Sequence, residues 1–460
     1  MVSLLKSKLA PLLDRLGQGA AIGQAMSALL SRTFAAGLAY LFQIYLAHAL
    51  KIDAYGIFVS FWTWQLIISN LVVLGYQESA VRFLPRYHAR GQEHLLQSFV
   101  HHGAKVVVIA SLLVAGIGAA LLWSFGDQFD KSYMLPALVL AFGLPIIAIE
   151  VYLEGVNRGL GWYLLSIVPS YIIRPIAVVA TMYVLGQSGM ELNAQLALGV
   201  MVGVTAVLII GQCLIMVKKI KPKTAPKTKS KHKRLRRAWL WATLPLVIVS
   251  GVDEMLYWSD IVVLGFLAEP ADVSIYFAAI RCMAFASFIH YGFMLVFARE
   301  FSLANADGDL TELRSRISMA STWTFWLTIP AVILIVAAGP VLLSFFGEAF
   351  GEGIVVMIVI GIGTIGKSAV GPASNLLIVL GKEKRDVTFS AVSLVANILI
   401  SILLVPLMGI LGAAIGTAAS QIVRALLLAR YCRQKLELDV TTSLNPRTLL
   451  KPKVRPRRSH

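Results

Sequence analysis

The chain has 460 residues, of which 58% are hydrophobic and only 14% are charged, and its formal net charge is +17. A composition this apolar excludes an ordinary soluble domain and predicts an all-α protein that crosses a membrane many times. The three cysteines, Cys213, Cys282 and Cys432, are odd in number and far apart, which argues against a disulfide framework and against a metal site.

The first twenty residues lack a long apolar core. We expect them to form a short amphipathic lead-in on the cytoplasmic surface rather than a cleavable signal peptide. Twelve apolar runs follow, each long enough to cross a hydrocarbon layer of ~30 Å. They are residues 25–50, 55–76, 99–125, 134–153, 163–186, 196–217, 239–267, 273–297, 317–346, 354–380, 387–407 and 411–429.

Residues 218–237, between the sixth and seventh runs, contain eleven Lys or Arg, one His and no acidic residue. Such a segment cannot bury a core, so we predict a solvated, flexible loop that stays on the cytoplasmic face, attracted to anionic lipid. Nucleic acid is not an expected partner, because no aromatic residues are interleaved with the cations. The loop separates a six-helix lobe at 1–217 from another at 238–430, and a basic cytoplasmic tail follows at 431–460.

The loops between the runs differ in charge on the two sides of the membrane. With the amino terminus inside, the predicted outer loops carry Lys51 and Lys131 as their only cations, against eight acidic residues. The predicted inner loops are rich in Arg and Lys, among them Arg82, Arg158 and Arg385. This asymmetry is the positive-inside pattern, and it places both termini in the cytoplasm.

The two sets of six runs are weakly alike. Residues 82–96, after the second run, and 299–313, after the eighth, share Arg, Gly and Leu at a constant offset of 217. Because each half has an even number of runs, both halves begin inside and the repeat is parallel. We therefore expect two pseudo-symmetric six-helix bundles related by an axis along the membrane normal, with a substrate path between them.

Ionisable residues inside the runs are the candidates for chemistry, because a charge at mid-bilayer costs roughly 3 kcal/mol. We single out four cations among them, namely Arg32, Arg174, Arg281 and Lys367. Guanidinium forks match phosphate oxygens, so this cationic set predicts binding of an anionic, phosphate-bearing substrate. The alternative for each residue is an interhelical ion pair that only holds the bundle together.

Three acidic residues are candidates for binding a coupling ion, either protons or sodium. Asp253 and Asp260 are seven residues apart and therefore lie on nearly the same face of their helix. Glu150 lies near the end of the fourth run and approaches the cytoplasmic side. The sequence contains no Walker A motif, so we expect an ion gradient rather than ATP or another cofactor to supply the energy.

Several stretches resemble the polysaccharide-unit flippases of the MOP superfamily, which act on O-antigen or exopolysaccharide units. They are PLMGILGAAIGTAAS at 406–420, IVVLG after Asp260, LAHAL at 46–50 with YGIF at 55–58, and NLLIVLGKEK at 375–384. The resemblance extends over almost the whole chain, including the number of runs and the central division. Twelve runs rather than fourteen distinguish the chain from the lipid II flippases of that superfamily.

This resemblance implies two six-helix lobes that form a V and alternate their access, driven by an H+ or Na+ gradient. It implies a polyprenyl pyrophosphate-linked oligosaccharide as cargo, moved from the inner to the outer leaflet of a bacterial inner membrane. The cationic lumen of the family would map to Arg32, Arg174, Arg281 and Lys367. The partners it suggests are the polysaccharide polymerase and chain-length proteins.

Two other functional classes stay open. A drug or small-cation antiporter of the same superfamily would favour an acidic, aromatic-lined pocket, whereas the apolar runs of this chain hold as many cations as acids. A membrane polymerase or ligase of glycans is an enzyme that needs a sizeable outer loop for its active site. Every outer loop predicted here is short, so we expect a transporter and no catalytic residues.

Overall fold

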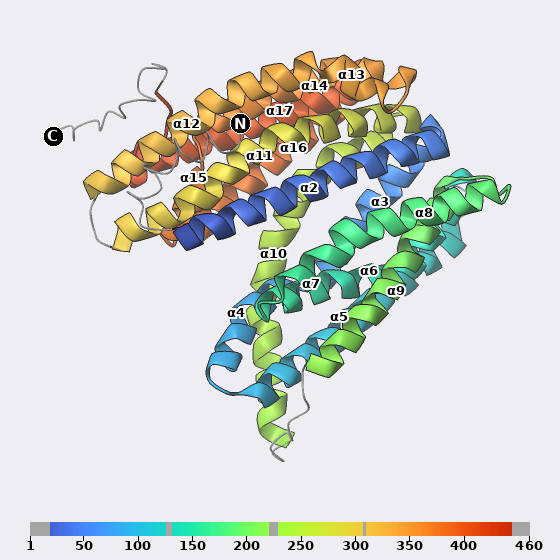
Figure 1. The fold of residues 1–460 in the computed structure, drawn as a ribbon, viewed down its shortest axis with the longest axis horizontal. Helices are drawn as coiled ribbons and strands as arrows, with labels where there is room; N and C mark the ends of the chain where they lie inside the picture. Colours follow the sequence, from blue (N-terminus) through green and yellow to red (C-terminus); the bar gives the residue numbers. More distant parts are fainter. Residues whose placement is uncertain (1–18, 126–130, 220–228, 307–309, 444–460) are drawn as a thin grey trace.

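The computed structural model describes residues 19–125, 131–219, 229–306 and 310–443, and Figure 1 shows their fold. Within these ranges the secondary structure is helical throughout, without strands. The predicted lead-in at the amino terminus, residues 220–228 of the predicted basic loop and residues 444–460 of the predicted tail lie outside the described residues.

We call the helices from α2 to α9 the first half and those from α10 to α17 the second half. The first half consists of α2 (Gly19–Leu50), α3 (Ile52–Val72), α4 (Tyr76–Ala89), α5 (Glu93–Phe125), α6 (Lys131–Gly159), α7 (Tyr163–Val168), the π-helix η2 (Pro169–Ile173), α8 (Arg174–Gln187) and α9 (Ala194–Lys219). The second half consists of α10 (Lys229–Leu267), α11 (Pro270–Ala306), α12 (Leu310–Ala337), α13 (Gly339–Ser344), the 3-10 helix η3 (Glu348–Glu352), α14 (Gly353–Ser368), α15 (Ala373–Val379), α16 (Glu383–Met408) and α17 (Ile410–Lys435).

Each of the twelve apolar runs predicted from the sequence lies on one of these helices or on consecutive ones. In lipid every backbone N–H and C=O must be paired within the protein, and a helix does this along its own length. Ten helical segments of the described residues are long and apolar enough to cross a membrane. Residues Phe34–Leu50 of α2 form a shorter apolar helix, and α10 carries the remaining predicted run. The prediction of an all-α membrane protein is thus confirmed.

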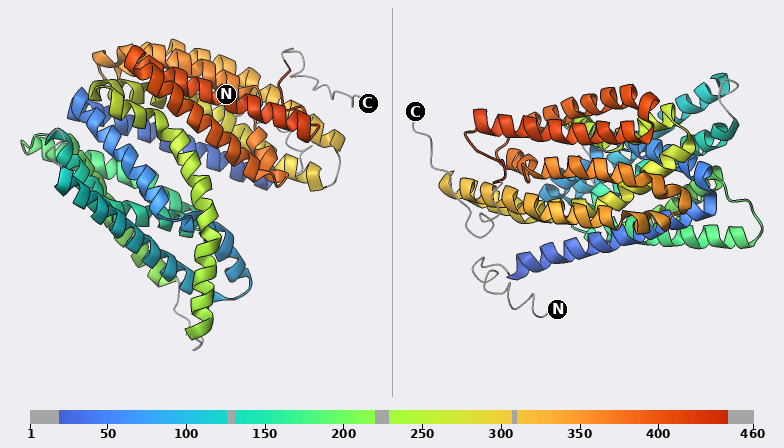
Figure 2. Two further views of the ribbon diagram at one scale, coloured as in Figure 1. Left: turned by 180° about the vertical axis from the view of Figure 1, so that it is seen from behind. Right: turned by 90° about the horizontal axis from the view of Figure 1, so that it is seen from above.

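The two halves are close together at one end and diverge toward the other (Figure 1). At the left of Figure 1, the group that contains α5, α6 and α9 is separated from the group that contains α12, α15 and α17. The view from behind in Figure 2 shows the same divergence, with α3 and α10 running diagonally from one group to the other. These two helices contact each other, and α10 also packs on α16.

Three clusters of buried apolar residues explain this shape. The largest contains residues of both halves, for example Tyr55 and Phe58 with Phe277. The second cluster, around Phe99, consists of first-half residues together with the start of α10, and the third, around Phe301, lies within the second half. Among the described residues, the largest core shared by the two halves therefore lies at the end that contains the α2–α3 and α10–α11 connections. By the charge pattern of the loops, this is the predicted outer end.

A close backbone contact seals the shared end. A side chain at Gly56 of α3 would overlap the carbonyl oxygen of Pro270, the first residue of α11. Nearby, the Ser274 hydroxyl donates a hydrogen bond to the carbonyl oxygen of Ile52, at 2.5 Å. Only glycine permits this approach, which brings the backbones of the two halves into contact.

The prediction of a basic loop over residues 218–237 is wrong at both of its ends. Helix α9 continues to Lys219, and α10 begins at Lys229, so residues 229–237 are helical. Lys and Arg are good helix formers, and the helix is anchored because Trp239 is buried and donates a hydrogen bond from Nε1 to the Tyr87 hydroxyl, at 2.8 Å. The first turns of α10 are thus attached to the first half, although the rest of α10 belongs to the second. The residue boundaries of the two lobes stay a prediction.

Replacing Gly56 with Ile should separate the two halves at their shared end, because the new side chain would occupy the position of the Pro270 carbonyl. Cys282 of α11 is buried there, with its Sγ atom 3.9 Å from the Tyr40 hydroxyl of α2. We expect Cys282 to become reactive toward a small membrane-impermeant thiol reagent, which peptide mass spectrometry would measure.

The matched control is Gly116→Ile on α5, where an added Cβ would meet nothing within 4 Å. Equal labelling of Cys282 in the two variants would contradict our conclusion that the Gly56–Pro270 contact holds the two halves together.

Candidate functional site

In the first half, the structure joins two of the predicted site residues. Nη1 of Arg174 on α8 donates to both carboxylate oxygens of Glu150 on α6, at 2.7 and 2.6 Å. The two side chains are only 15% and 8% exposed. The guanidinium also lies over the ring of Trp62 on α3, with its central carbon 5.4 Å from the ring centroid. The predicted substrate cation and the predicted ion-coupling acid are therefore partners in one buried ion pair.

The position of Arg174 follows from an irregularity in the fifth span. Residues 169–173 form the π-helix η2, which begins at Pro169, and Arg174 is the first residue of α8. A proline removes a backbone donor, and a π-turn inserts an extra residue into the helical repeat. The extra residue rotates the following side chains about the helix axis, which turns Arg174 toward α6.

In the second half, Lys367 lies next to a break in the tenth span. Helix α14 ends at Ser368 and α15 begins at Ala373, because Gly371 has a left-handed φ of 52° and Pro372 has no N–H. Lys367 is exposed, and it forms no ion pair with any carboxylate of the described residues. It is thus a cation near the middle of a span that is accessible and unneutralised.

Arg424 on α17 lies close to Lys367, and it is a candidate that the sequence-based selection omitted. It pairs with Asp386 of α16 at 3.2 Å and donates to the Ser374 hydroxyl at 3.3 Å. Arg424 lies inside the last predicted span, so the criterion that selected Arg174 would also have found it. Lys367 and His290 of α11 are both within electrostatic range of Arg424.

The predicted acid Asp253 belongs to the same group, since it is within electrostatic range of Arg424 and Asp386. Its side chain is exposed. Several buried polar atoms of this region have no hydrogen-bond partner among the described side chains and backbone. They are Nδ1 of His290, Oγ of Ser390, Oε1 of Gln421 and Nε of Arg424. The charged and polar side chains of this region are contributed by α10, α11, α14, α15, α16 and α17 of the second half.

Asp260 and Arg281 lie apart from this group. The Asp260 carboxylate is 5% exposed and accepts hydrogen bonds from the Tyr276 hydroxyl at 2.6 Å and the Thr417 hydroxyl at 3.3 Å. Asp253 and Asp260 share a helix, but one side chain is exposed and the other is buried. The Arg281 guanidinium stacks on Phe277, with its central carbon 4.4 Å from the ring centroid. Arg32 lies on α2 before Phe34, where the description of side chains begins, so its assignment lies outside the described side chains.

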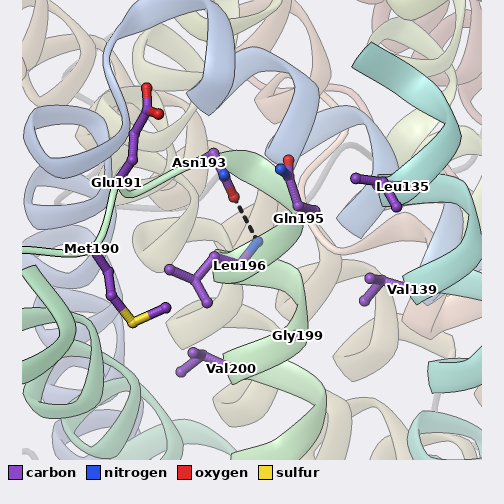
Figure 3. A pocket seen from close by; sticks show the side chains of 9 residues that line it. All are labelled: Leu135, Val139, Met190, Glu191, Asn193, Gln195, Leu196, Gly199 and Val200. Carbon is purple, nitrogen blue, oxygen red and sulfur yellow. Dashed lines mark hydrogen bonds between the residues drawn. The ribbon is translucent and has the colours of Figure 1, made fainter. Parts of the chain in front are cut away.

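The best-formed surface pockets contain none of the predicted site residues. Figure 3 shows one between α6 and α9, lined mainly by apolar side chains such as Leu135 and Val139. Its polar part is a helix cap, because Oδ1 of Asn193 accepts the N–H of Leu196 at 3.0 Å. Another pocket, of about 580 Å³, lies at the opposite end of the first half beside Arg158. Among the described residues no cluster of three or more His, Cys, Asp or Glu side chains could hold a metal ion.

Comparison with known proteins identifies the family. A family model described as "Polysaccharide biosynthesis protein" matches residues 23–287. The chain belongs to this family. The resemblance seen in the sequence motifs is thereby confirmed, and the chain is a multi-pass membrane protein.

A curated relative is the probable low-salt glycan biosynthesis flippase Agl15 of Haloferax volcanii, which is 25% identical over 186 residues. The match covers 40% of this chain and 39% of the relative, so it spans well under half the length of both.

Two solved structures share the fold over most of their length. The lipid II flippase MurJ in an inward closed conformation aligns with a TM-score of 0.68 at 15% identity, over 92% of this chain and 88% of that one. A multidrug resistance MATE family transporter of the MOP superfamily, in an inward-facing conformation, aligns with a TM-score of 0.66 at 14% identity, over 87% and 94%. Both likenesses concern the architecture, which agrees with the predicted pair of helical bundles.

The Arg174–Glu150 pair should behave as a buried ion pair. Replacing Glu150 with Leu leaves the Arg174 charge without its partner, which costs about 3–5 kcal/mol. We therefore expect a clear fall in the thermal unfolding temperature of the purified protein in detergent. The double variant Glu150→Leu with Arg174→Met removes both charges and should regain most of the loss.

The control is Glu269→Leu, which removes an exposed acid from the α10–α11 connection. Equal destabilisation in the single and double variants of the pair would argue against a buried ion pair.

Proposed function

We propose that this protein moves a polyprenyl pyrophosphate-linked oligosaccharide from the inner to the outer leaflet of a bacterial inner membrane, for surface polysaccharide synthesis. The observation that carries the proposal is a pair of cations, one in each half, at irregular points of membrane spans. Arg174 follows the π-helix η2, and Lys367 precedes the break between α14 and α15. Broken helices mark binding sites in transporters built from two repeats, and phosphate is the anion that such cations favour.

The two cations differ in what they offer a phosphate. Lys367 is exposed and unneutralised, with Arg424 close by, so it can bind an anion directly. Arg174 is held by Glu150. A pyrophosphate that reaches Arg174 must displace Glu150, and the freed carboxylate then takes up a proton or a sodium ion. In this mechanism, competition at Arg174 couples cargo binding to ion binding.

Further oxygen ligands for a coupling ion occur in the second half. Asp260, Tyr276 and Thr417 place a carboxylate and two hydroxyls in one buried cluster contributed by α10, α11 and α17. Asp253 offers a second carboxylate beside Arg424. We propose that these acids bind H+ or Na+ and that no other cofactor is needed.

The joint at one end of the molecule supports alternating access. The halves share a core near Gly56, and the hydroxyl of Tyr40 on α2 donates to the carbonyl oxygen of Leu342 on α13, at 2.8 Å. The opposite ends have separate cores. With both termini in the cytoplasm, this arrangement is an inward-facing state that receives cargo from the inner leaflet. The partners we propose are the polysaccharide polymerase and chain-length proteins.

Cells that lack this protein should accumulate the cargo on the wrong side of the membrane. Without translocation, the completed lipid-linked glycan stays on the cytoplasmic leaflet, where an impermeant glycan-modifying enzyme added outside cannot reach it. The measurement is mass spectrometry of extracted polyprenyl-linked glycans, combined with that leaflet assay. Unchanged glycan lipids and normal surface polysaccharide would instead favour a small-molecule antiporter, the class of the MATE transporter that shares the fold.

Replacing Lys367 with Ala should reduce translocation at least about tenfold, because a charge-assisted hydrogen bond to phosphate contributes about 1.5–3 kcal/mol. Lys367→Arg keeps the charge and should retain part of the activity. Lys382→Ala, which removes an exposed lysine just before α16, is the matched control. Full translocation by Lys367→Ala, at normal abundance in the membrane, would exclude Lys367 from the binding site.

A further inference from the structure

The chain does not leave the second half where α17 ends. Residues 436–443, which we call the strap, turn back after Lys435 through Glu437, whose φ is 54°. The N–H of Leu438 donates to the carbonyl oxygen of Cys432 at 3.0 Å, which fixes this reversal. The predicted cytoplasmic tail therefore begins with a segment that packs against the helices.

The strap is buried on one side. Leu438 is 3% exposed and Val440 is 1% exposed, and both belong to the apolar cluster that contains Phe301. Glu437 and Thr441, on either side of this pair, are exposed, and Asp439 between the two is half-buried. Alternation of buried and exposed side chains is the pattern of an extended chain that lies along a surface.

The strap extends far along the bundle. The carbonyl oxygen of Ser443 accepts a hydrogen bond from Nε1 of Trp326 at 3.0 Å. Trp326 lies 16 residues after Leu310, the first residue of α12, which corresponds to about 24 Å along a helix. The strap thus returns from the end of α17 to roughly the middle of α12.

At that depth the strap reaches the break beside Lys367. The N–H of Thr442 donates to the carbonyl oxygen of Ala369 at 2.8 Å. Ala369 lies between α14 and α15, where Gly371 and Pro372 interrupt the helical hydrogen bonds and leave carbonyl groups in need of other donors. On its other side, the break packs against α12, because a Cβ at Gly371 would lie 2.7 Å from Cα of Ser321. The strap and α12 therefore contact the residues between α14 and α15 from two sides.

We propose that the strap is a positioning segment of the transport site, which fixes the break in the tenth span and so presents the Lys367 ammonium to the cargo phosphate. Irregular backbone at membrane depth is tolerated where it is buried in protein or borders water. The buried face of the strap, at Leu438 and Val440, meets the first condition. The role assigned to Lys367 here rests on the proposed function.

Replacing Thr442 with Pro tests the strap, because it removes the single N–H that donates to Ala369, whereas Thr442→Ala keeps that N–H. Hydrogen exchange measured by mass spectrometry should show about tenfold faster exchange at residues 366–373 in the proline variant only, as expected when one hydrogen bond is lost. Translocation of the lipid-linked glycan should fall about tenfold in the same variant, at normal abundance in the membrane. The alanine variant should match the wild type in both measurements.

A second pair of variants tests the strap independently, in case the proline variant does not fold. Val440→Asp places a charge in the buried face of the strap, and Thr441→Asp places the same charge on its exposed face. Faster exchange at 366–373 with unchanged translocation would show that the strap only stabilises the bundle, and would overturn the proposal. Unchanged exchange would overturn it too. If the wild type moves no glycan lipid, the proposed function fails, yet the exchange measurement still decides whether the strap holds the break.

Discussion

A lipid bilayer offers no hydrogen-bond partners to a polypeptide backbone, and the structure of this protein depends on that constraint. Most of the chain satisfies it with long helices. The informative places are those where the helical pattern is interrupted, at η2 in the fifth span and at residues 369–372 in the tenth. There the backbone needs other partners, and in the tenth span the strap supplies one through the N–H of Thr442. Each interruption lies directly beside a cation that the bilayer would otherwise exclude.

The free-energy cost of burying an unpaired charge also explains how the cations of the site are arranged. Arg174 and Arg424 each have a carboxylate partner, Glu150 and Asp386 respectively, so their charges are neutralised inside the protein. Lys367 has none among the described residues and keeps its exposure instead. An anionic cargo can bind such a lysine without displacing a protein group, whereas binding at a paired arginine releases a carboxylate. We propose that this difference gives the two halves unequal roles in binding the cargo.

The contact between Gly56 and Pro270, where the two halves meet, bears on how the halves can move relative to each other. Contact between backbones at Gly56 and Pro270 requires a residue without a side chain, so the shared end is closely packed and specific. Away from this end the described residues form two further apolar clusters, one within the first half and the start of α10 and one within the second half. Helix α10 links the two, since its start packs with Tyr87 of the first half and its later turns pack on α16. A relative rotation of the halves about the shared end would therefore act on α10.

The sequence by itself determined the fold class, the order of the apolar runs, the family and most of the charges that lie inside those runs. These follow from local properties, since an apolar run of sufficient length has no other stable form in a bilayer, and a charge inside it is conspicuous. The helical start of α10 escaped this reasoning, because its anchor at Trp239 depends on a contact with distant residues. Arg424 met the same criterion as the selected cations, so the sequence alone could have identified it.

Only the tertiary structure decided which charges are partners, because Glu150 and Arg174 are 24 residues apart and lie on different helices. It alone showed the strap, since the hydrogen bonds from Thr442 to Ala369 and from Trp326 to Ser443 leave no trace in the local sequence pattern. Composition and periodicity report what a segment is, whereas pairing depends on how separate segments pack.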